Sequence, residues 1–174
     1  MVNVIPERLT AFRIYKDGTD DMTGVADIEL PSFESMKETV KGAGIAGEYE
    51  SPTLGHFGSL KITLNWRTVE KNFMQLMKQQ AQRLDCRGAF QDYDAGEGIY
   101  KTRAVRIVIQ GPPISGKLGK YESAGNVGGS TEFEVFYIKI TIDGKEYIEL
   151  DKLNFICRID GVDYLKEIRN ALGI

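Results

Sequence analysis

The sequence predicts a single, mainly β domain of the α+β class that spans residues 1–174. Three observations lead to this prediction: apolar and polar residues alternate through most of the chain, turn-forming residues separate the alternating runs, and only two segments have helical spacing. Such alternation is typical of antiparallel sheets, because strands buried on both faces would be continuously apolar. With 174 residues and 42% hydrophobic content, the chain can form one core.

The clearest strand is predicted over residues 60–67, where every second residue is apolar. One face carries Leu60, Ile62, Leu64 and Trp66, and the other carries Lys61, Thr63, Asn65 and Arg67. Four further runs share this period, with the following apolar positions: Phe12 and Ile14; Ala26, Ile28 and Leu30; Leu84, Cys86 and Phe90; Val105, Ile107 and Ile109. Each run predicts a half-buried strand, because alternate side chains of a strand point to opposite faces of the sheet.

Turn-forming residues predict hairpins at three places between these runs. They are Asp17 with Gly18, the stretch 94–98, and Asp143 with Gly144. The last of these turns joins alternating runs at 136–142 and 147–150, and another alternating run follows at 153–159. The last third of the chain therefore predicts a three-strand meander.

Two segments change to helical spacing. In the first, Val69, Phe73, Leu76 and Met77 recur at i, i+4, i+7 and i+8, and Thr68 is available as the N-cap. In the second, Leu165, Ile168 and Leu172 share a stripe, Asp163 can cap the start, and Gly173 stands where a helix ends. We expect one flanking helix and one short C-terminal helix.

Two long stretches, 31–57 and 111–130, show neither period and are rich in Gly, Pro and Ser. Unstructured loops longer than about 15 residues are uncommon in a compact domain unless they have a function. We therefore expect both stretches to be loops that serve binding or assembly.

Each of these stretches contains a motif that resembles a nucleotide-binding loop. Gly42, Gly44 and Gly47 match the G-x-G-x-x-G spacing, but no buried strand precedes them and no helical stripe follows. Residues 111–118 fit the phosphate-binding loop except that Leu118 replaces the Ser or Thr that coordinates magnesium. We interpret both as glycine-hinged loops, and an enzyme that uses nucleotide phosphates is the weakest of the functional alternatives.

The composition includes few residues that could form a metal, redox or nucleophilic site. Cys86 and Cys157 lack the close spacing of metal or redox motifs, and His56 is the single histidine, with no Ser or Cys in a nucleophile context. The net charge of −3 disfavours tight binding of nucleic acid. No apolar run is long enough to span a membrane, and residues 1–10 lack a signal-peptide pattern. These features predict a soluble protein made in the cytoplasm, with no catalytic residues, no cofactor and no metal.

The most specific region is the C-terminal third. The order there is strand, tight turn, strand, strand and short terminal helix. The residues that carry it are 137–146, 148–151, Asn154, Ile156, 160–163 and 169–174. Residues 24–31, followed by the glycine-rich 41–47, agree with the same pattern in the N-terminal half. This order resembles the major tail tube proteins of contractile-tailed bacteriophages and of phage-tail-like bacteriocins. The resemblance covers nearly the whole chain and is least distinctive over 69–98.

The resemblance implies two packed antiparallel sheets that form a β-sandwich or barrel-like tail tube domain, with a flanking helix and a short C-terminal helix. Six copies would join into a ring, and rings would stack inside a contractile sheath as a conduit for DNA or ions, without specific DNA binding. Sheath, baseplate and tail terminator proteins are the implied partners, and the location is a virion tail or an extracellular bacteriocin particle. The candidate subunit-contact residues are Gly42, Gly44, Gly47, Gly111, Gly116 and Lys117.

Two alternatives remain open at this point. The sequence does not separate a phage tail from a headless bacteriocin, which neighbouring capsid or terminase genes would do. A small β-barrel binding module, with its mouth closed by the two long loops, would instead be a monomer with a saturable pocket.

Overall fold

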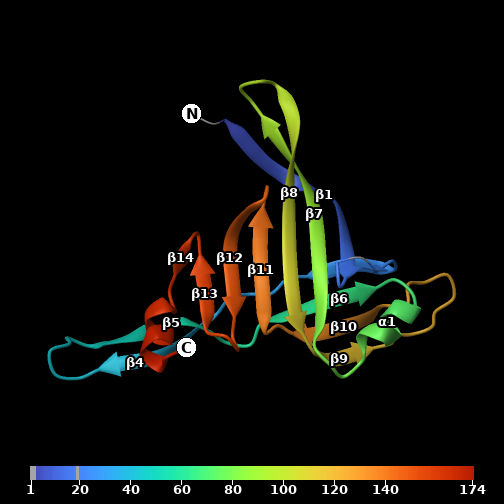
Figure 1. The fold of residues 1–174 in the computed structure, drawn as a ribbon. Coiled ribbons are helices and arrows are strands. Elements are labelled where there is room, and N and C mark those ends of the chain that lie inside the picture. The colour runs from blue at the N-terminus through green and yellow to red at the C-terminus, as the bar shows by residue number, and fades with distance from the viewer. Residues whose placement is uncertain (1–2, 19) are drawn as a thin grey trace.

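The computed structural model describes residues 3–18 and 20–174 (Figure 1). It contains an eight-stranded sheet, a four-stranded sheet and a two-stranded hairpin, and every strand pairing in them is antiparallel. Two short helices complete the described part of the chain. The predicted mainly β fold with two packed sheets is confirmed, and the separate hairpin is an addition to it.

The large sheet has the order β14-β13-β12-β11-β8-β7-β1-β2. Its strands are β1 (Val4–Lys16), β2 (Asp20–Asp21), β7 (Gln82–Asp94), β8 (Ile99–Gly111), β11 (Tyr137–Ile142), β12 (Lys145–Asp151), β13 (Ile156–Ile159) and β14 (Val162–Asp163). The three predicted turns are confirmed, and the predicted meander is β11, β12 and β13. Asp143 and Gly144 both have positive φ, of 48° and 81°, as a two-residue type I′ hairpin requires.

The small sheet has the order β3-β6-β10-β9. Its strands are β3 (Val25–Glu29), β6 (Lys61–Trp66), β10 (Gly129–Glu134) and β9 (Pro113–Lys117). The alternation predicted for residues 60–67 is confirmed, because Leu60, Ile62, Leu64 and Trp66 are all buried. The Trp66 Nε1–H donates a hydrogen bond of 3.0 Å to Thr131 Oγ1 on β10, so its one polar atom is satisfied inside the core.

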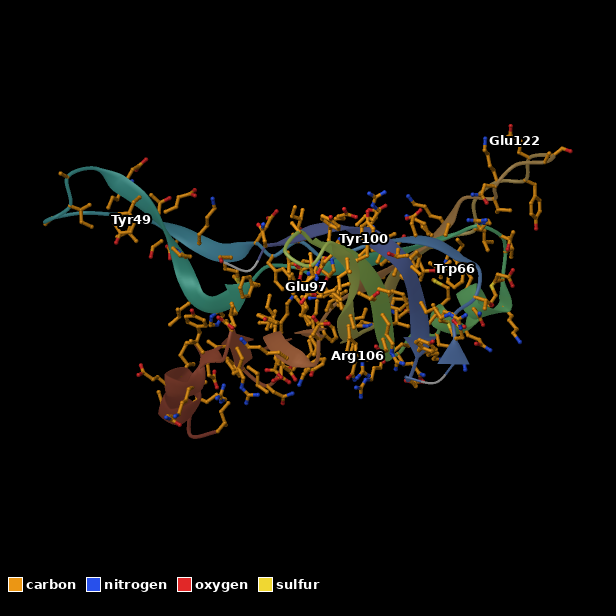
Figure 2. The ribbon with its side chains drawn as sticks, turned by 90° about the horizontal axis from the view of Figure 1, so that it is seen from above. Tyr49, Trp66, Glu97, Tyr100, Arg106 and Glu122 are labelled. Atoms are coloured by element: carbon orange, nitrogen blue, oxygen red, sulfur yellow. The ribbon has the colours of Figure 1, made fainter. Side chains whose placement is uncertain are left out.

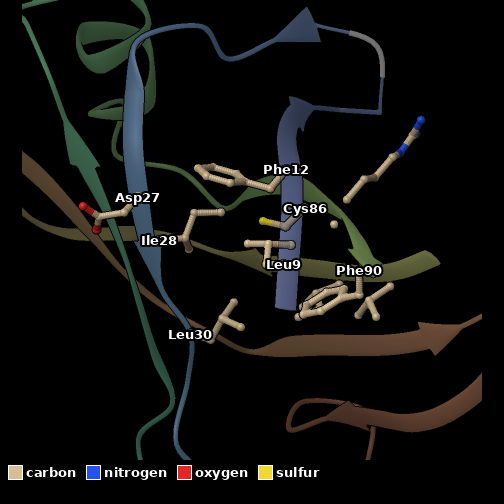
Figure 3. A pocket seen from close by; sticks show the side chains of 11 residues that line it. Leu9, Phe12, Asp27, Ile28, Leu30, Cys86 and Phe90 are labelled. Carbon is tan, nitrogen blue, oxygen red and sulfur yellow. The ribbon is translucent and has the colours of Figure 1, made fainter. Parts of the chain in front are cut away.

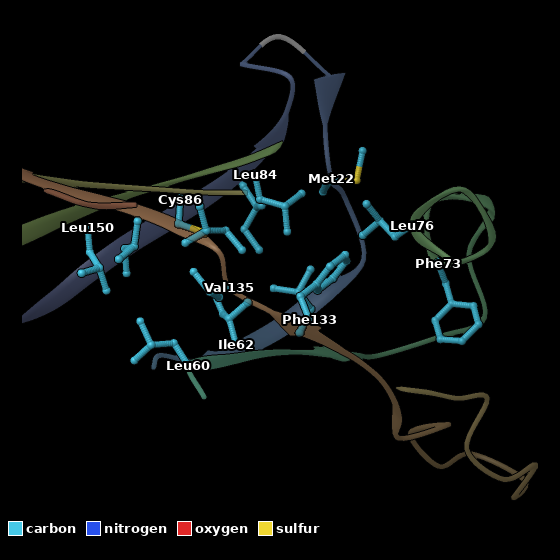
Figure 4. Packing of buried hydrophobic residues seen from close by; sticks show 14 of the residues in the cluster. Met22, Leu60, Ile62, Phe73, Leu76, Leu84, Cys86, Phe133, Val135 and Leu150 are labelled. Atoms are coloured by element: carbon cyan, nitrogen blue, oxygen red, sulfur yellow. The ribbon is translucent and has the colours of Figure 1, made fainter. Parts of the chain in front are cut away.

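The core lies between the two sheets (Figure 4). Ile62 and Phe133 from the small sheet belong to the same buried cluster as Leu84, Cys86 and Leu150 from the large sheet. At one end α1 (Lys71–Leu76) closes this core, and the Phe73 ring packs edge-to-face on Trp66 with centroids 6.1 Å apart.

Both helices form, but neither begins as predicted. The first starts after Glu70 rather than after Thr68, because the Thr68 hydroxyl donates to the Glu70 carboxylate at 2.8 Å instead of capping the helix. The second, α2 (Lys166–Leu172), starts after Leu165, whose N–H donates to Asp163 Oδ1. Its predicted end is confirmed, since Gly173 takes the left-handed conformation at φ 74°.

The two predicted loops contain more regular structure than the sequence suggested. Residues 31–57 hold β4 (Ser35–Lys41) and β5 (Glu48–Phe57), which form the long hairpin. Of residues 111–130, only 118–128 lie outside strands β8, β9 and β10, apart from Pro112. The loop prediction was therefore wrong for most of 31–57, whereas most of 111–130 lies outside strands as predicted. The cause in 31–57 is physical: only the base of the hairpin, at Phe57, packs against the core, so strict apolar alternation is not required along the rest of it.

Candidate subunit-contact surfaces

The β4–β5 hairpin projects well beyond the two sheets, with Tyr49 toward its far end (Figure 2). Gly42, Gly44 and Gly47 form its tip, with φ values of 147°, 87° and 116°. A Cβ added at any of the three would meet nothing within 4 Å, so glycine is needed there for backbone conformation and not for space. The G-x-G-x-x-G motif is thus a hairpin turn with no helix after it, and the dinucleotide interpretation is excluded.

The two faces of the hairpin differ in polarity. Val40 lies opposite Tyr49, and these cross-strand partners share one face, which Met36 and Glu38 join by alternation along β4. The other face carries the Lys37–Glu50 ion pair. Met36 and Tyr49 are each 54% exposed, so the apolar face is not covered by the subunit itself.

The base of the hairpin is anchored to the large-sheet side of the molecule. Phe33 and Phe57 pack edge-to-face with centroids 5.8 Å apart. Gly55 lies so close to Leu165, just before α2, that an added Cβ would approach Leu165 Cδ2 to 2.6 Å. The hairpin therefore has a fixed base and an uncovered far half.

The other predicted contact residues lie at the opposite part of the fold. Gly111 ends β8, and a Cβ there would come within 1.7 Å of the Glu134 carbonyl oxygen. A Cβ added at Gly116 in β9 would come within 2.5 Å of the sulfur of Met77, a flexible side chain that can move aside. Gly111 is thus required inside the subunit, whereas Lys117 is exposed at the end of β9. This segment is a paired strand with no helix following it, so it is not a phosphate-binding loop.

A cleft of about 380 Å³ lies between α1 and residues 118–128. Its apolar lining comes from Val69, Met74, Leu118, Tyr121 and Val127, and we call it the α1 cleft. Tyr121 is 89% exposed, and Met74 and Leu118 are more than half exposed. Figure 2 places this end, marked by Glu122, opposite the hairpin end marked by Tyr49.

The outward face of the small sheet is polar and built largely from short side chains and carboxylates. Asn65 donates to Asp27 at 2.5 Å and to Glu29 at 3.2 Å, and Lys61 pairs with Glu132 at 3.3 Å. At its edge, burial opposes ionisation of Glu134, but hydrogen bonds from Ser59 and Lys152 outweigh it and lower the pKa of that carboxyl.

The outward face of the large sheet is held together by a buried carboxylate. The Asp85 side chain is 1% exposed and accepts hydrogen bonds from Arg87 and Arg106, both at 2.7 Å. Burial alone would raise the pKa of Asp85, but the two guanidinium groups lower it below its ordinary value. Arg87 also lies over the Tyr15 ring at 4.5 Å, so strands β1, β7 and β8 are tied together on this face.

The described residues offer no arrangement for catalysis. His56 Nδ1 lies 2.8 Å from the Leu54 carbonyl oxygen, in a local contact of the hairpin. Cys86 and Cys157 are free and buried, and burial raises the pKa of Cys86 to about 12, which suppresses its thiolate. Within residues 3–18 and 20–174 no three His, Cys, Asp or Glu side chains gather as a metal site. Nor is any helix in this part long and apolar enough to cross a membrane.

An apolar groove opens between β3 and the strands β1, β7 and β8 (Figure 3). Leu9, Phe12, Ile28 and Phe90 line it, and its volume is about 230 Å³. The sheets of the described residues do not close into a barrel, so the fold gives no support to a β-barrel binding module.

Comparison with known proteins gives one consistent result. Residues 6–173 match the family model described as phage tail tube protein FII. The chain is 25% identical to the tail tube protein of Escherichia phage P2, over 98% of this chain and 99% of that protein. It is 23% identical to the major tail tube protein of Serratia phage KSP20, over 98% of both chains.

A solved structure shares the fold. It is the sheath/tube terminator of an extracellular contractile injection system, with a TM-score of 0.53 and 10% identity over 78% of this chain and 96% of that one. Sequence reasoning found the glycine turn of the hairpin but missed Met36, Tyr49, Met74 and Tyr121. No local motif marks these four, because their exposure depends on the tertiary fold.

Proposed function

We propose the following assembly for this chain, which belongs to the phage tail tube protein FII family and is a structural, non-enzymatic tail tube protein of the contractile type. Residues 1–174 form one tail tube domain, and six copies join into a ring. Rings stack into a hollow tube inside a sheath, which conducts DNA or ions. Phage and bacteriocin tubes share these properties, and both would place the protein in a particle tail.

The observation that carries this proposal is the open small sheet. Strands β3 and β9 are its end strands, and neither has a further strand beside it among the described residues. Open edges invite pairing with another chain and are an aggregation hazard in a monomer. Joining the β9 edge of one copy to the β3 edge of the next pairs these backbone groups, and closing the ring removes the last edge.

The polar face of the same sheet suits the lumen. It presents Thr63, Asn65 and Ser130 between carboxylates such as Asp27 and Glu132. Of the basic residues on this face, Lys61 is paired with Glu132. A polyanion adheres where lysine and arginine release counterions from its phosphates. A face of short polar side chains and carboxylates lets DNA pass without holding it. A neutral to acidic lumen is therefore part of the proposal.

The contacts outside the lumen follow from the same arrangement. The hairpin tip with Gly42, Gly44 and Gly47 reaches a neighbouring copy, and Gly111, Gly116 and Lys117 lie near the β9 edge where copies join. Sheath, baseplate and terminator proteins meet the remaining outer surface and the tube ends.

Negative-stain electron microscopy of the purified protein tests this function. Rings or hollow rods of constant diameter are the expected result. A protein that stays monomeric at high concentration and on addition of its sheath protein would reject the proposal. For the lumen, a tube structure with a continuous basic stripe along the channel would reject the assignment of the small sheet.

A further inference from the structure

Three arginines lie side by side on the outward face of the large sheet. Arg13 on β1 is the register partner of Arg87 on β7, and Arg87 is the register partner of Arg106 on β8. We call these three residues the arginine row. Their side chains are 68%, 46% and 49% exposed, so another molecule can reach all of them. Like charges directly opposite each other destabilise a sheet, and residues that break such a local rule are expected at functional sites.

The subunit itself fixes the orientation of two of these guanidinium groups. The buried Asp85 carboxylate accepts hydrogen bonds from Nε and Nη2 of Arg87 and from Nε and Nη2 of Arg106. The Tyr15 ring supports the Arg87 guanidinium at 4.5 Å. Within the described residues, no hydrogen bond uses Nη1 of Arg87 or Arg106. Both groups therefore present donors in a fixed position to an acceptor from outside the subunit.

The charge around the arginine row is not balanced. Asp85 is shared by two arginines, and Arg13 pairs with Asp21 at 3.0 Å. Arg83 is exposed and lies two residues before Asp85, on the same face of β7. The arginine row and Arg83 together carry a charge of +4, and the two carboxylates carry −2, which leaves +2. Two further carboxylates would balance this charge.

Guanidinium groups held in this way bind carboxylates and phosphates, because their planar forks match the geometry of both. The place of the arginine row in the proposed tube decides between these two sources. The small sheet faces the lumen there, so the outward face of the large sheet points away from DNA and toward the sheath. Figure 2 shows Arg106 on the side of the molecule away from Tyr49 and Glu122, which mark the hairpin and the loop 118–128.

We propose that the arginine row is a carboxylate-binding site, at which an acidic segment of the sheath protein attaches to the outer wall of the tube. The Nη1 donors of Arg87 and Arg106 bind one carboxylate of this segment, and Arg13 attracts the next. Asp85 keeps the two guanidinium groups apart and correctly oriented while the site is empty. This inference rests on the proposed function and names the chemistry of the partner at that outer surface.

A titration of the free subunit tests the carboxylate site without any assembly. The probe is a tetraglutamate peptide, and the readout is the NMR signals of the arginine Nε–H groups. We expect the signals of Arg87 and Arg106 to shift with tetraglutamate and to stay unchanged with tetraglutamine. The Arg8 signal should stay unchanged with both peptides. Equal shifts with the two peptides, no shift with either, or a stronger response to an oligonucleotide than to tetraglutamate would overturn the proposal.

Co-sedimentation of the sheath protein with preformed tubes tests the partner. Arg13→Glu should weaken sheath binding at least about tenfold, which is the effect of losing one charge-assisted hydrogen bond. The matched control is Arg8→Glu, which should bind the sheath as wild type does. Arg8 lies on the same strand, is 73% exposed, and is about 16 Å from Arg13 along β1.

The two experiments separate this proposal from the proposed function. Arg13→Glu tubes that bind the sheath as strongly as wild-type tubes would overturn the sheath site but leave the tube standing. Wild-type protein that forms no tubes would reject the proposed function, and a tetraglutamate response in that protein would still support the carboxylate site.

Discussion

Asp85→Asn should destabilise the subunit, because Asp85 is a buried anion shared by two arginines. The substitution keeps the shape of the side chain but removes its charge. Arg87 and Arg106 are cross-strand partners, so without the carboxylate two like charges face each other on neighbouring strands. The guanidinium groups, which now donate at 2.7 Å to an ionised carboxylate, are left with a neutral amide oxygen that accepts weaker hydrogen bonds.

The magnitude follows from the burial of each partner. Removing one member of a fully buried ion pair costs about 3–5 kcal/mol. Here the carboxylate is 1% exposed but the arginine side chains are 46% and 49% exposed, and solvent screens their half of the interaction. We therefore expect a loss of about 2 kcal/mol in the free energy of unfolding, or about 4–8 °C in melting temperature for a chain of this length.

Urea denaturation from pH 7 to pH 3 is the assay. Because the folded-state pKa of Asp85 is lowered, its stabilisation is complete above the unfolded pKa of about 3.9 and is lost as the pH falls toward the folded value. The difference between wild type and variant should therefore shrink below about pH 4. The control is Asp21→Asn on the same face, whose exposed pair with Arg13 is expected to contribute about 0–1 kcal/mol. Equal effects of the two substitutions, or a gap that grows in acid, would refute this reasoning.

Three further predictions follow from the structure. Calorimetry should detect no binding of ATP or NAD, because neither glycine motif precedes a helix; micromolar binding weakened by Gly44→Ala or Lys117→Ala would contradict this. Phe133→Ala should cost about 3–5 kcal/mol in urea denaturation, since the ring is fully buried between the sheets; a loss under 1 kcal/mol would mean the core is misplaced. Hydrogen exchange should show amides of 36–54 and 118–128 protected more strongly in tubes than in free subunits, and equal protection would argue against ordering on assembly.

The sequence predicts the parts of this fold whose side chains are sorted by the subunit's own core. Leu60 to Trp66 alternate without a fault because β6 has one buried and one solvent face. Gly173 marks the end of α2 because its backbone takes the left-handed conformation, which glycine adopts readily and which ends the helix. Helix starts are harder, since Thr68 and Asp163 have polar partners, Glu70 and Arg169, that compete with capping.

The exposed surfaces, including those proposed for assembly, are harder to predict from the sequence than the core. Gly42, Gly44 and Gly47 are recognisable because their conformation is local to the hairpin tip. Met74 and Tyr121 are 47 positions apart in sequence, and only the pairing of β9 with β10 and the packing of α1 bring them to one cleft. The alternation of a strand or helix reflects what is buried inside one subunit, so side chains that are exposed on the subunit do not stand out in the sequence pattern.

The same reasoning applies to the segments for which an assembly role is proposed. Most of the β4–β5 hairpin has no core behind it, because only its base at Phe57 packs against the core. A two-stranded hairpin of this kind adds little stability to a monomer. The open edges of β3 and β9 have the same character, because they expose backbone groups that another strand could pair. Both features become stabilising only when a second copy supplies the missing partner. In the proposed tube, a neighbouring copy would pair these edges and cover the hairpin, so part of the stability that the free subunit lacks would come from assembly.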